Sequence, residues 1–239
     1  MKYKAPILWM GAMLMLLVAV GSAQASNPKA LVDAWNEDMA EIRQELDQQK
    51  WKKARRGADK LLDRMSAKIR TGDGAWNFYA RVLMHRALAR AGAGDMDEAE
   101  WDWHMAATFD EEVAWVDLAE FEVAGDRLET YRREFKEETA GWGPADPNNV
   151  KMVDPTVTPP KKRRSPRPNF PWATRGLKSK TVVQAVIDVD GRLKMPRLFE
   201  LQQPTQAYAA LETVRRWRFE PATQDGKPVS VYYNLTVNF

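Results

Sequence analysis

Apolar residues recur every three or four positions through the first half of the chain, as at Leu31, Trp35, Met39 and Ile42. This spacing places them on one face of an α-helix. No proline interrupts residues 29–143, and polar or glycine-rich breaks occur near residues 50, 71–74 and 92–94. The pattern predicts helices over residues 28–49, 51–70, 75–92, 96–108 and 111–137, with Gly125 as a kink or break in the last of them.

Two of these predicted helices carry small residues at matching positions. Trp51, Ala54 and Ala58 are spaced like Met96, Ala99 and Trp103. Small side chains let neighbouring helices approach closely, and residues 94–110 resemble a tetratricopeptide helix pair, although the two segments lie further apart than in that family. The resemblance implies a tetratricopeptide-like helical module over residues 26–140 that binds a protein or peptide.

Near the C-terminus the spacing of apolar residues changes from three or four positions, typical of a helix, to two positions, typical of a strand. Residues 182–189 are rich in β-branched side chains and end at Asp190-Gly191, a strong hairpin turn. Residues 192–200 form the predicted returning strand, in which Pro196 indicates a bulge or an edge. Residues 207–217 are predicted as a helix, and residues 229–239 alternate as a strand with its odd positions on one face. The pattern predicts a small α+β domain over residues 172–239.

A proline-rich segment separates the two regions. Eight prolines fall within residues 144–171, so we expect residues 141–171 to be an extended linker without helix or sheet. It contains a basic run, Lys161, Lys162, Arg163, Arg164 and Arg167. The interpretation preferred from sequence is a solvated linker extended by self-repulsion. The alternative is contact with anionic membrane or cell wall. Nucleic acid is not expected, since no aromatic residues interleave with the run.

The first 25 residues have the pattern of an export signal. Lys2 and Lys4 precede the uncharged apolar residues 5–21, and Ala23 and Ala25 have the spacing of a cleavage site. We expect cleavage after Ala25 and a periplasmic location. The alternative is that residues 5–21 are retained as an inner-membrane anchor, although their length is at the short end for a span.

Charge divides the chain into two unlike halves. Residues 26–143 carry 18 Lys and Arg against 25 Asp and Glu, a net of −7, whereas residues 144–239 carry 16 against 8, a net of +8. This difference predicts two modules with different surfaces. The chain has no cysteine, which excludes disulfides, thiolate catalysis and cysteine-ligated zinc.

The residues that could support catalysis or metal binding are few. His85 and His104 are the two histidines, and both fall in predicted helices. Glu100 and His104 are one helical turn apart, but a surface pair explains them better than a metal site. Asp95 and Glu98 fit a helix capping box. No nucleotide, hydrolase or zinc-protease motif is present, so we expect a non-enzymatic protein without cofactor or metal.

The order of elements near the C-terminus resembles that of the C-terminal domain of the TonB family. A strand and an Asp-Gly turn come first, then a helix and the sequence Trp-Arg-Phe-Glu-Pro-Ala, and last a second turn and the final strand. The residues that carry the resemblance are Pro171, Gly191, Trp217, Phe219, Pro221 and Gly226. TonB proteins span the Gram-negative periplasm and grip outer-membrane transporters. Residues 5–21 contain neither the Ser nor the His of the family's proton-coupled helix, which argues against energy transduction.

The resemblance implies that function depends on a strand edge. In TonB-like domains an extended peptide adds beside an exposed strand. The matching edge strand here comprises Val229, Ser230, Val231, Tyr232, Tyr233, Asn234, Leu235, Thr236 and Val237. The expected function is a periplasmic adaptor that captures a segment of an envelope or outer-membrane transport protein. The alternatives are a TonB-type energy transducer, a structural envelope protein, and an edge used for homodimerisation.

Overall fold

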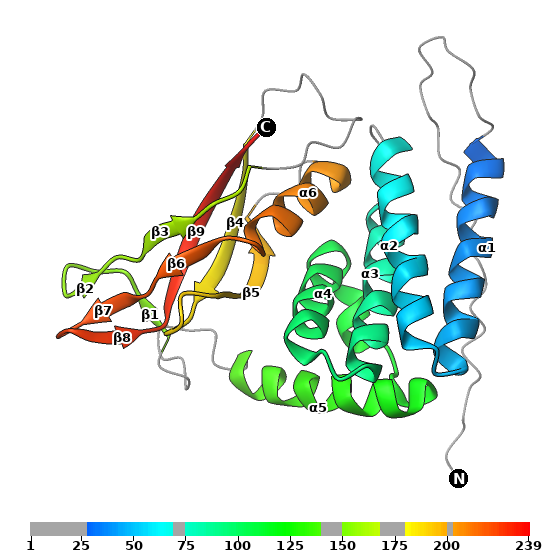
Figure 1. Cartoon of the computed structure of the whole chain (residues 1–239), viewed down its shortest axis with the longest axis horizontal. Helices are drawn as coiled ribbons and strands as arrows, with labels where there is room; N and C mark the ends of the chain where they lie inside the picture. Colours follow the sequence, from blue (N-terminus) through cyan, green and yellow to red (C-terminus); the bar gives the residue numbers. More distant parts are fainter. Residues whose placement is uncertain (1–27, 69–74, 140–149, 168–179, 200–202) are drawn as a thin grey trace.

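The computed structural model describes residues 28–68, 75–139, 150–167, 180–199 and 203–239, as a layer of helices beside a set of β-sheets (Figure 1). The predicted signal, residues 1–25, lies outside these ranges. Four helices match the hydrophobic periodicity closely: α1 (Pro28–Asp47), α2 (Trp51–Lys68), α3 (Ala75–Gly92) and α4 (Met96–Phe109). Across the described ranges no helix is long and apolar enough to span a bilayer. The predicted helical module is therefore confirmed as helical.

The fifth predicted helix is wrong over residues 111–121. Residues 111–121 instead form two short 3₁₀ turns, η1 (Glu111–Trp115) and η2 (Ala119–Phe121), and α5 (Glu122–Thr139) follows. The carboxylates of Asp110 and Asp117 accept hydrogen bonds from the backbone two residues onward, at 3.1 and 3.0 Å, which is how Asp competes with helix propagation. Gly125 does not break α5. A Cβ there would lie 1.9 Å from the carbonyl oxygen of Leu118, so the glycine permits close packing.

The C-terminal region is an α+β domain, as predicted. Its elements are β4 (Lys180–Ile187), β5 (Leu193–Leu198), α6 (Pro204–Val214), β6 (Arg218–Glu220), β7 (Ala222–Gln224), β8 (Lys227–Val229) and β9 (Val231–Asn238). The main sheet has the order β1-β9-β4-β5, and α6 lies between this sheet and the helices (Figure 1). β9 runs antiparallel to β4, with Ile187 opposite Val231 and Lys180 opposite Asn238.

The proline-rich segment forms strands, contrary to the prediction of a linker without sheet. The three strands are β1 (Lys151–Met152), β2 (Val157–Thr158) and β3 (Lys161–Arg164), which pair with β9, β7 and β6 respectively. Prolines 155, 159, 160 and 166 fall between or after these strands, where the ladder needs no N–H donor. Proline therefore limits the length of each strand without preventing pairing.

The helical and β regions share one hydrophobic core, so the expectation of two modules joined only by a linker is wrong. Tyr79 of α3 lies at the junction and is fully buried. Its ring centroid is 5.4 Å from that of Tyr208 on α6, and its hydroxyl is 3.4 Å from the hydroxyl of Thr205. Aromatic contacts of this kind hold the two regions as one body.

A buried network of charges crosses the same junction. Arg86 of α3 donates to both carboxylate oxygens of Asp102 on α4, at 2.7 and 2.8 Å, and to Glu212 of α6 at 2.6 Å. Arg90 lies 2.7 Å from Asp102. Burial disfavours the charged form of Arg86, yet Asp102 and Glu212 outweigh it and raise its pKa. Burial raises the pKa of Asp102 above its usual value, although Arg86 and Arg90 act in the opposite direction.

Candidate functional site

The predicted edge strand is divided in the structure. Val229 ends β8, which pairs with β7, and β9 begins at Val231. β9 has β4 along its whole length on one flank. On the other flank β1 pairs in parallel with Val231 and Tyr232. The prediction of an open edge is therefore wrong for the first two residues of β9. The prediction failed because the proline-rich segment pairs with β9 through β1, and sequence periodicity did not reveal this pairing.

Beyond Tyr232, the backbone of β9 alternates between its two flanks. The amide of Lys151 donates to the carbonyl of Ser230 at 2.9 Å, so the carbonyl of Ser230 points toward β1. Because successive backbone groups of a strand point to opposite sides, Asn234 and Thr236 direct their N–H and C=O groups to this same flank. The described part of β1 ends at Met152. In the described ranges, no strand pairs with residues 233–238 on this side.

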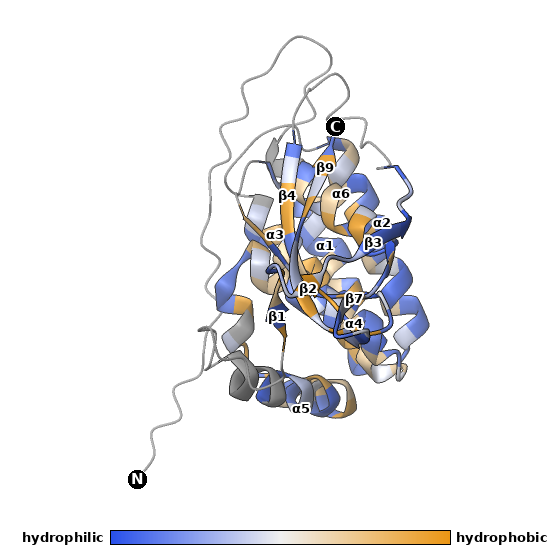
Figure 2. Cartoon of the chain, turned by 90° about the vertical axis from the view of Figure 1, so that its left-hand side faces the viewer, coloured by the Kyte–Doolittle hydropathy of each residue, from blue (hydrophilic) through white to orange (hydrophobic). Residues whose placement is uncertain are grey.

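The side chains of β9 alternate as the sequence indicated. Val231, Leu235 and Val237 are at most 1% exposed, whereas Asn234 and Thr236 face solvent. The exposed side chains of Met152 and Val153 lie where β1 leaves the sheet. In the view of Figure 2, β9, β4 and β1 lie in front of the helices, with alternating polar and apolar colour. A ligand on the open flank would therefore meet polar β9 side chains beside a small apolar patch.

The opposite edge of the sheet is covered. Pro196 lies in the edge strand β5, where the register with β4 shifts and Met195 takes a φ of 51°. The prediction of a bulge or an edge at Pro196 is thus confirmed on both counts. The hydroxyl of Thr108 on α4 donates to the carbonyl of Pro196 at 3.3 Å. The helical region therefore blocks strand addition at β5, which the sequence did not predict.

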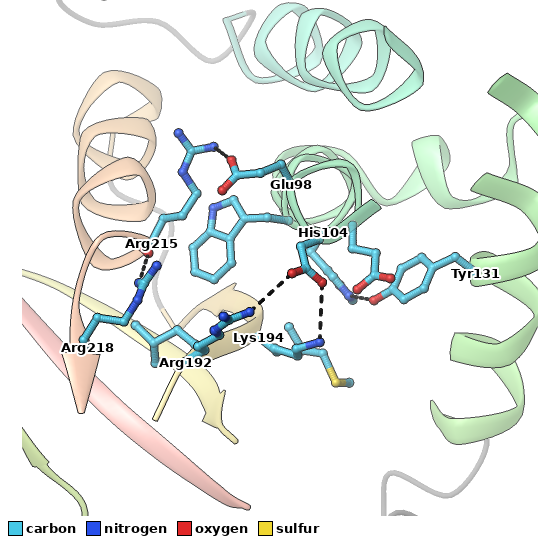
Figure 3. A pocket seen from close by; sticks show the side chains of 12 residues that line it. Glu98, His104, Tyr131, Arg192, Lys194, Arg215 and Arg218 are labelled. Carbon is cyan, nitrogen blue, oxygen red and sulfur yellow. Dashed lines mark hydrogen bonds and ion pairs between the residues drawn. The ribbon is translucent and has the colours of Figure 1, made fainter. Parts of the chain in front are cut away.

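A cavity of about 90 Å³ lies where α4 and α5 meet β5 and the end of α6. Arg192 and Lys194 lie 3.5 and 4.0 Å from Asp97, and Arg215 lies 2.8 Å from Glu98 (Figure 3). Because these cations lie beside carboxylates, the lining of the cavity carries both positive and negative charge. Asp95 precedes α4, but its side chain makes no capping bond. The capping-box prediction is therefore wrong, because the Glu98 carboxylate pairs with Arg90 and Arg215 instead.

His104 is buried and His85 is half-buried. The Nε2 atom of His104 lies 2.5 Å from the hydroxyl of Tyr131 (Figure 3), and burial lowers the pKa of His104 to about 3. Burial likewise lowers the pKa of His85 to about 4, and its Nδ1 lies 2.7 Å from the carbonyl of Arg81. No three metal-ligating side chains cluster in the described ranges. The interpretation of Glu100 and His104 as a surface pair is wrong for His104, because its ring is buried against Tyr131.

The residues that carried the family resemblance occupy core and turn positions. Trp217 and Phe219 are 5% and 3% exposed, and Gly191 and Gly226 take φ values of 73° and 76°. Pro221 separates β6 from β7, and Pro171 lies outside the described residues. These positions specify the fold around β9.

Residues 167–239 match the family described as Gram-negative bacterial TonB protein C-terminal.

The TonB match connects the chain to the Gram-negative envelope and to transport or protein interaction there. TonB-family domains are generally non-catalytic. No curated protein matches the chain. The matched range begins after β1, β2 and β3, so these strands and the helical region lie outside the TonB match although they pack against it.

Proposed function

We propose that this protein is an exported adaptor that binds an extended segment of an envelope protein, such as an outer-membrane transporter, by strand addition to β9. The observation that carries the proposal is the flank beyond Met152. There the backbone groups of Asn234 and Thr236 point away from β4. An incoming peptide would continue the position of β1 along the sheet.

Two other edges are less suitable. β5 is covered by α4 through the contact of Thr108 with Pro196. β8 is three residues long, and Pro228 at its centre has no N–H to donate. The alternating faces of β9 and its greater length therefore favour it as the docking strand.

The expected affinity is modest. The N–H and C=O groups of Asn234 and Thr236 offer four main-chain hydrogen bonds, each worth about 0.5–1.5 kcal/mol net. Their sum, about 2–6 kcal/mol, corresponds at best to a Kd of roughly tens of micromolar, even before association costs. A partner must therefore add side-chain contacts, and exposed Met152 and Val153 provide apolar surface at one end of the site.

The test has two steps. A photoreactive residue at Thr236, exposed on β9, should crosslink the partner in cells, whereas the same residue at Asp225 in the β7–β8 turn should not. A synthetic peptide of the crosslinked segment should then slow hydrogen exchange at the amides of Asn234 and Thr236. The amide of Leu235 faces β4 and should change little. Protection elsewhere, with no change at Thr236, would contradict the proposal.

A further inference from the structure

Six basic side chains lie along or next to the two-stranded ribbon of β3 and β6. This basic ridge consists of Lys161, Lys162, Arg163, Arg164, Arg167 and Arg218, and all six are exposed. β3 appears uniformly hydrophilic in Figure 2. The sequence interpretation of these residues as part of a solvated linker is wrong, because β3 pairs with β6.

The pairing register places several cations on one face. Lys161 lies opposite Glu220, and Arg164 lies opposite Arg218, with an irregularity between Lys162 and Arg164. Directly opposed residues share a face of a ribbon, so Lys161, Arg164 and Arg218 face the same way, with Glu220 as the one acid among them. Like charges directly opposite each other are destabilising. An anionic ligand would relieve the repulsion between Arg164 and Arg218.

Trp217 anchors the ridge to the core. The ammonium group of Lys162 lies 4.0 Å from the centroid of the Trp217 ring, and the indole N–H of Trp217 donates to the carbonyl of Pro166 at 3.1 Å. Arg218 donates to the carbonyls of Arg215 and Trp217 at 2.9 and 2.7 Å. Two of the six cations, Lys162 and Arg218, are therefore held in place by side-chain contacts, and the backbone of β3 is fixed by its pairing with β6.

The ridge differs from the buried arginines in forming no ion pair among the described residues, although Glu220 lies opposite Lys161. Arg86, Arg90 and Arg215 all form ion pairs with nearby carboxylates. Within the described part of the chain, no ion pair involves a side chain of the ridge, and Glu220 is the one acidic residue of β3 and β6. The ridge thus keeps its positive field, which reaches about 8 Å at physiological ionic strength.

We propose that the basic ridge docks the protein on an anionic phospholipid surface. The ridge is a row of cations on a narrow ribbon, and Arg218 is the one member of it that also lines the cavity between α4 and β5. Such a row suits a laterally extended array of phosphates better than a single shaped ligand. The TonB match places the chain in an envelope where phospholipid headgroups form such arrays. Each cation near an anionic bilayer contributes roughly a fivefold increase in binding.

The test compares binding to vesicles. The protein is purified as the cell processes it. Sedimentation then measures its partition onto phosphatidylcholine vesicles with and without the anionic lipid phosphatidylglycerol. The ratio of the two partitions isolates the electrostatic part, since an apolar N-terminus would bind both. The ridge variant replaces Lys161, Arg163, Arg164 and Arg167 with Gln and keeps Lys162 on Trp217. Its ratio should fall by at least roughly fiftyfold.

A matched control removes the same charge from another surface. It replaces Lys52, Arg56, Lys60 and Lys68 of α2, all exposed, with Gln. Its ratio should change by less than about threefold, since these cations lie away from the ridge. Circular dichroism and thermal unfolding check that both variants fold.

Several outcomes would overturn the proposal. One is an equal fall of the partition ratio in the ridge variant and the control variant. Another is a wild-type protein that binds anionic and neutral vesicles equally. A third is inorganic phosphate that releases the protein from anionic vesicles more than NaCl of equal ionic strength does. Ridge-dependent sedimentation with purified cell-wall sacculi, but not with vesicles, would assign the ridge to a different partner. Because β3 and β6 are separate from β9, exchange at Thr236 tests peptide capture independently of all these results.

Discussion

Gly191 and Gly226 look alike in sequence, since each follows an Asp in a predicted turn, and both take positive φ. Their surroundings differ. A Cβ on Gly191 would lie 1.8 Å from the carbonyl oxygen and 2.8 Å from the carbonyl carbon of Phe219, whereas a Cβ on Gly226 would meet nothing within 4 Å. Alanine at Gly226 therefore tests backbone strain alone, whereas alanine at Gly191 tests the same strain together with a steric clash.

The expected magnitudes follow from these contacts. Positive φ costs a non-glycine residue about 1–2 kcal/mol, so Gly226→Ala should lower the free energy of unfolding by about that amount. Gly191→Ala carries the same strain and must also displace the backbone of Phe219. The amide of Phe219 donates to the carbonyl of Gly191 at 2.9 Å, and its side chain is 3% exposed. We expect a loss of about 3–5 kcal/mol, as for other disruptions of a buried contact.

Urea denaturation followed by tryptophan fluorescence measures both losses. The chain has ten tryptophans, and Trp217 lies two residues from Phe219, so the signal reports the affected region. The slope of free energy against urea should be the same in both variants if the native states are equally compact. Equal losses for Gly191→Ala and Gly226→Ala would refute the close approach of the 188–192 turn to β6.

Three further predictions concern burial and processing. Asp102→Asn should lower the free energy of unfolding by about 3–5 kcal/mol, because it leaves Arg86 buried without its main carboxylate. A loss under about 1 kcal/mol in urea denaturation would contradict this role. The pKa values of His85 and His104 are lowered by burial to about 4 and about 3, so the unfolded chain binds protons first as pH falls. Stability should be full above about pH 6.5 and decline by several kcal/mol toward pH 4, and His104→Phe should flatten the profile of unfolding free energy against pH. N-terminal sequencing should show that the exported protein begins at Ser26, whereas a protein that still begins at residue 1 would favour an anchored transducer.

Local patterns in the sequence were sufficient for most individual elements. Helices α1 to α4 follow from the three- and four-residue spacing of apolar residues, and β9 follows from strict alternation. These periodicities depend on neighbours along the chain, so they can be read without knowing the fold. The 3₁₀ turns before α5 were missed because Asp110 and Asp117 give local hydrogen bonds that compete with a helical apolar pattern.

The candidate site was only partly predictable. The sequence identified β9 and its two faces, but not that β1 pairs with Val231 and Tyr232, nor that α4 covers the edge at Pro196. It also gave Gly191 and Gly226 the same role, although only Gly191 meets another strand closely. Sequence alone thus determined α1 to α4, β4, β5 and β9, but not the strands β1 to β3 or the 3₁₀ turns before α5. Tertiary structure decided which strand flanks stay open and which charges are buried, because those depend on contacts between segments distant in the chain.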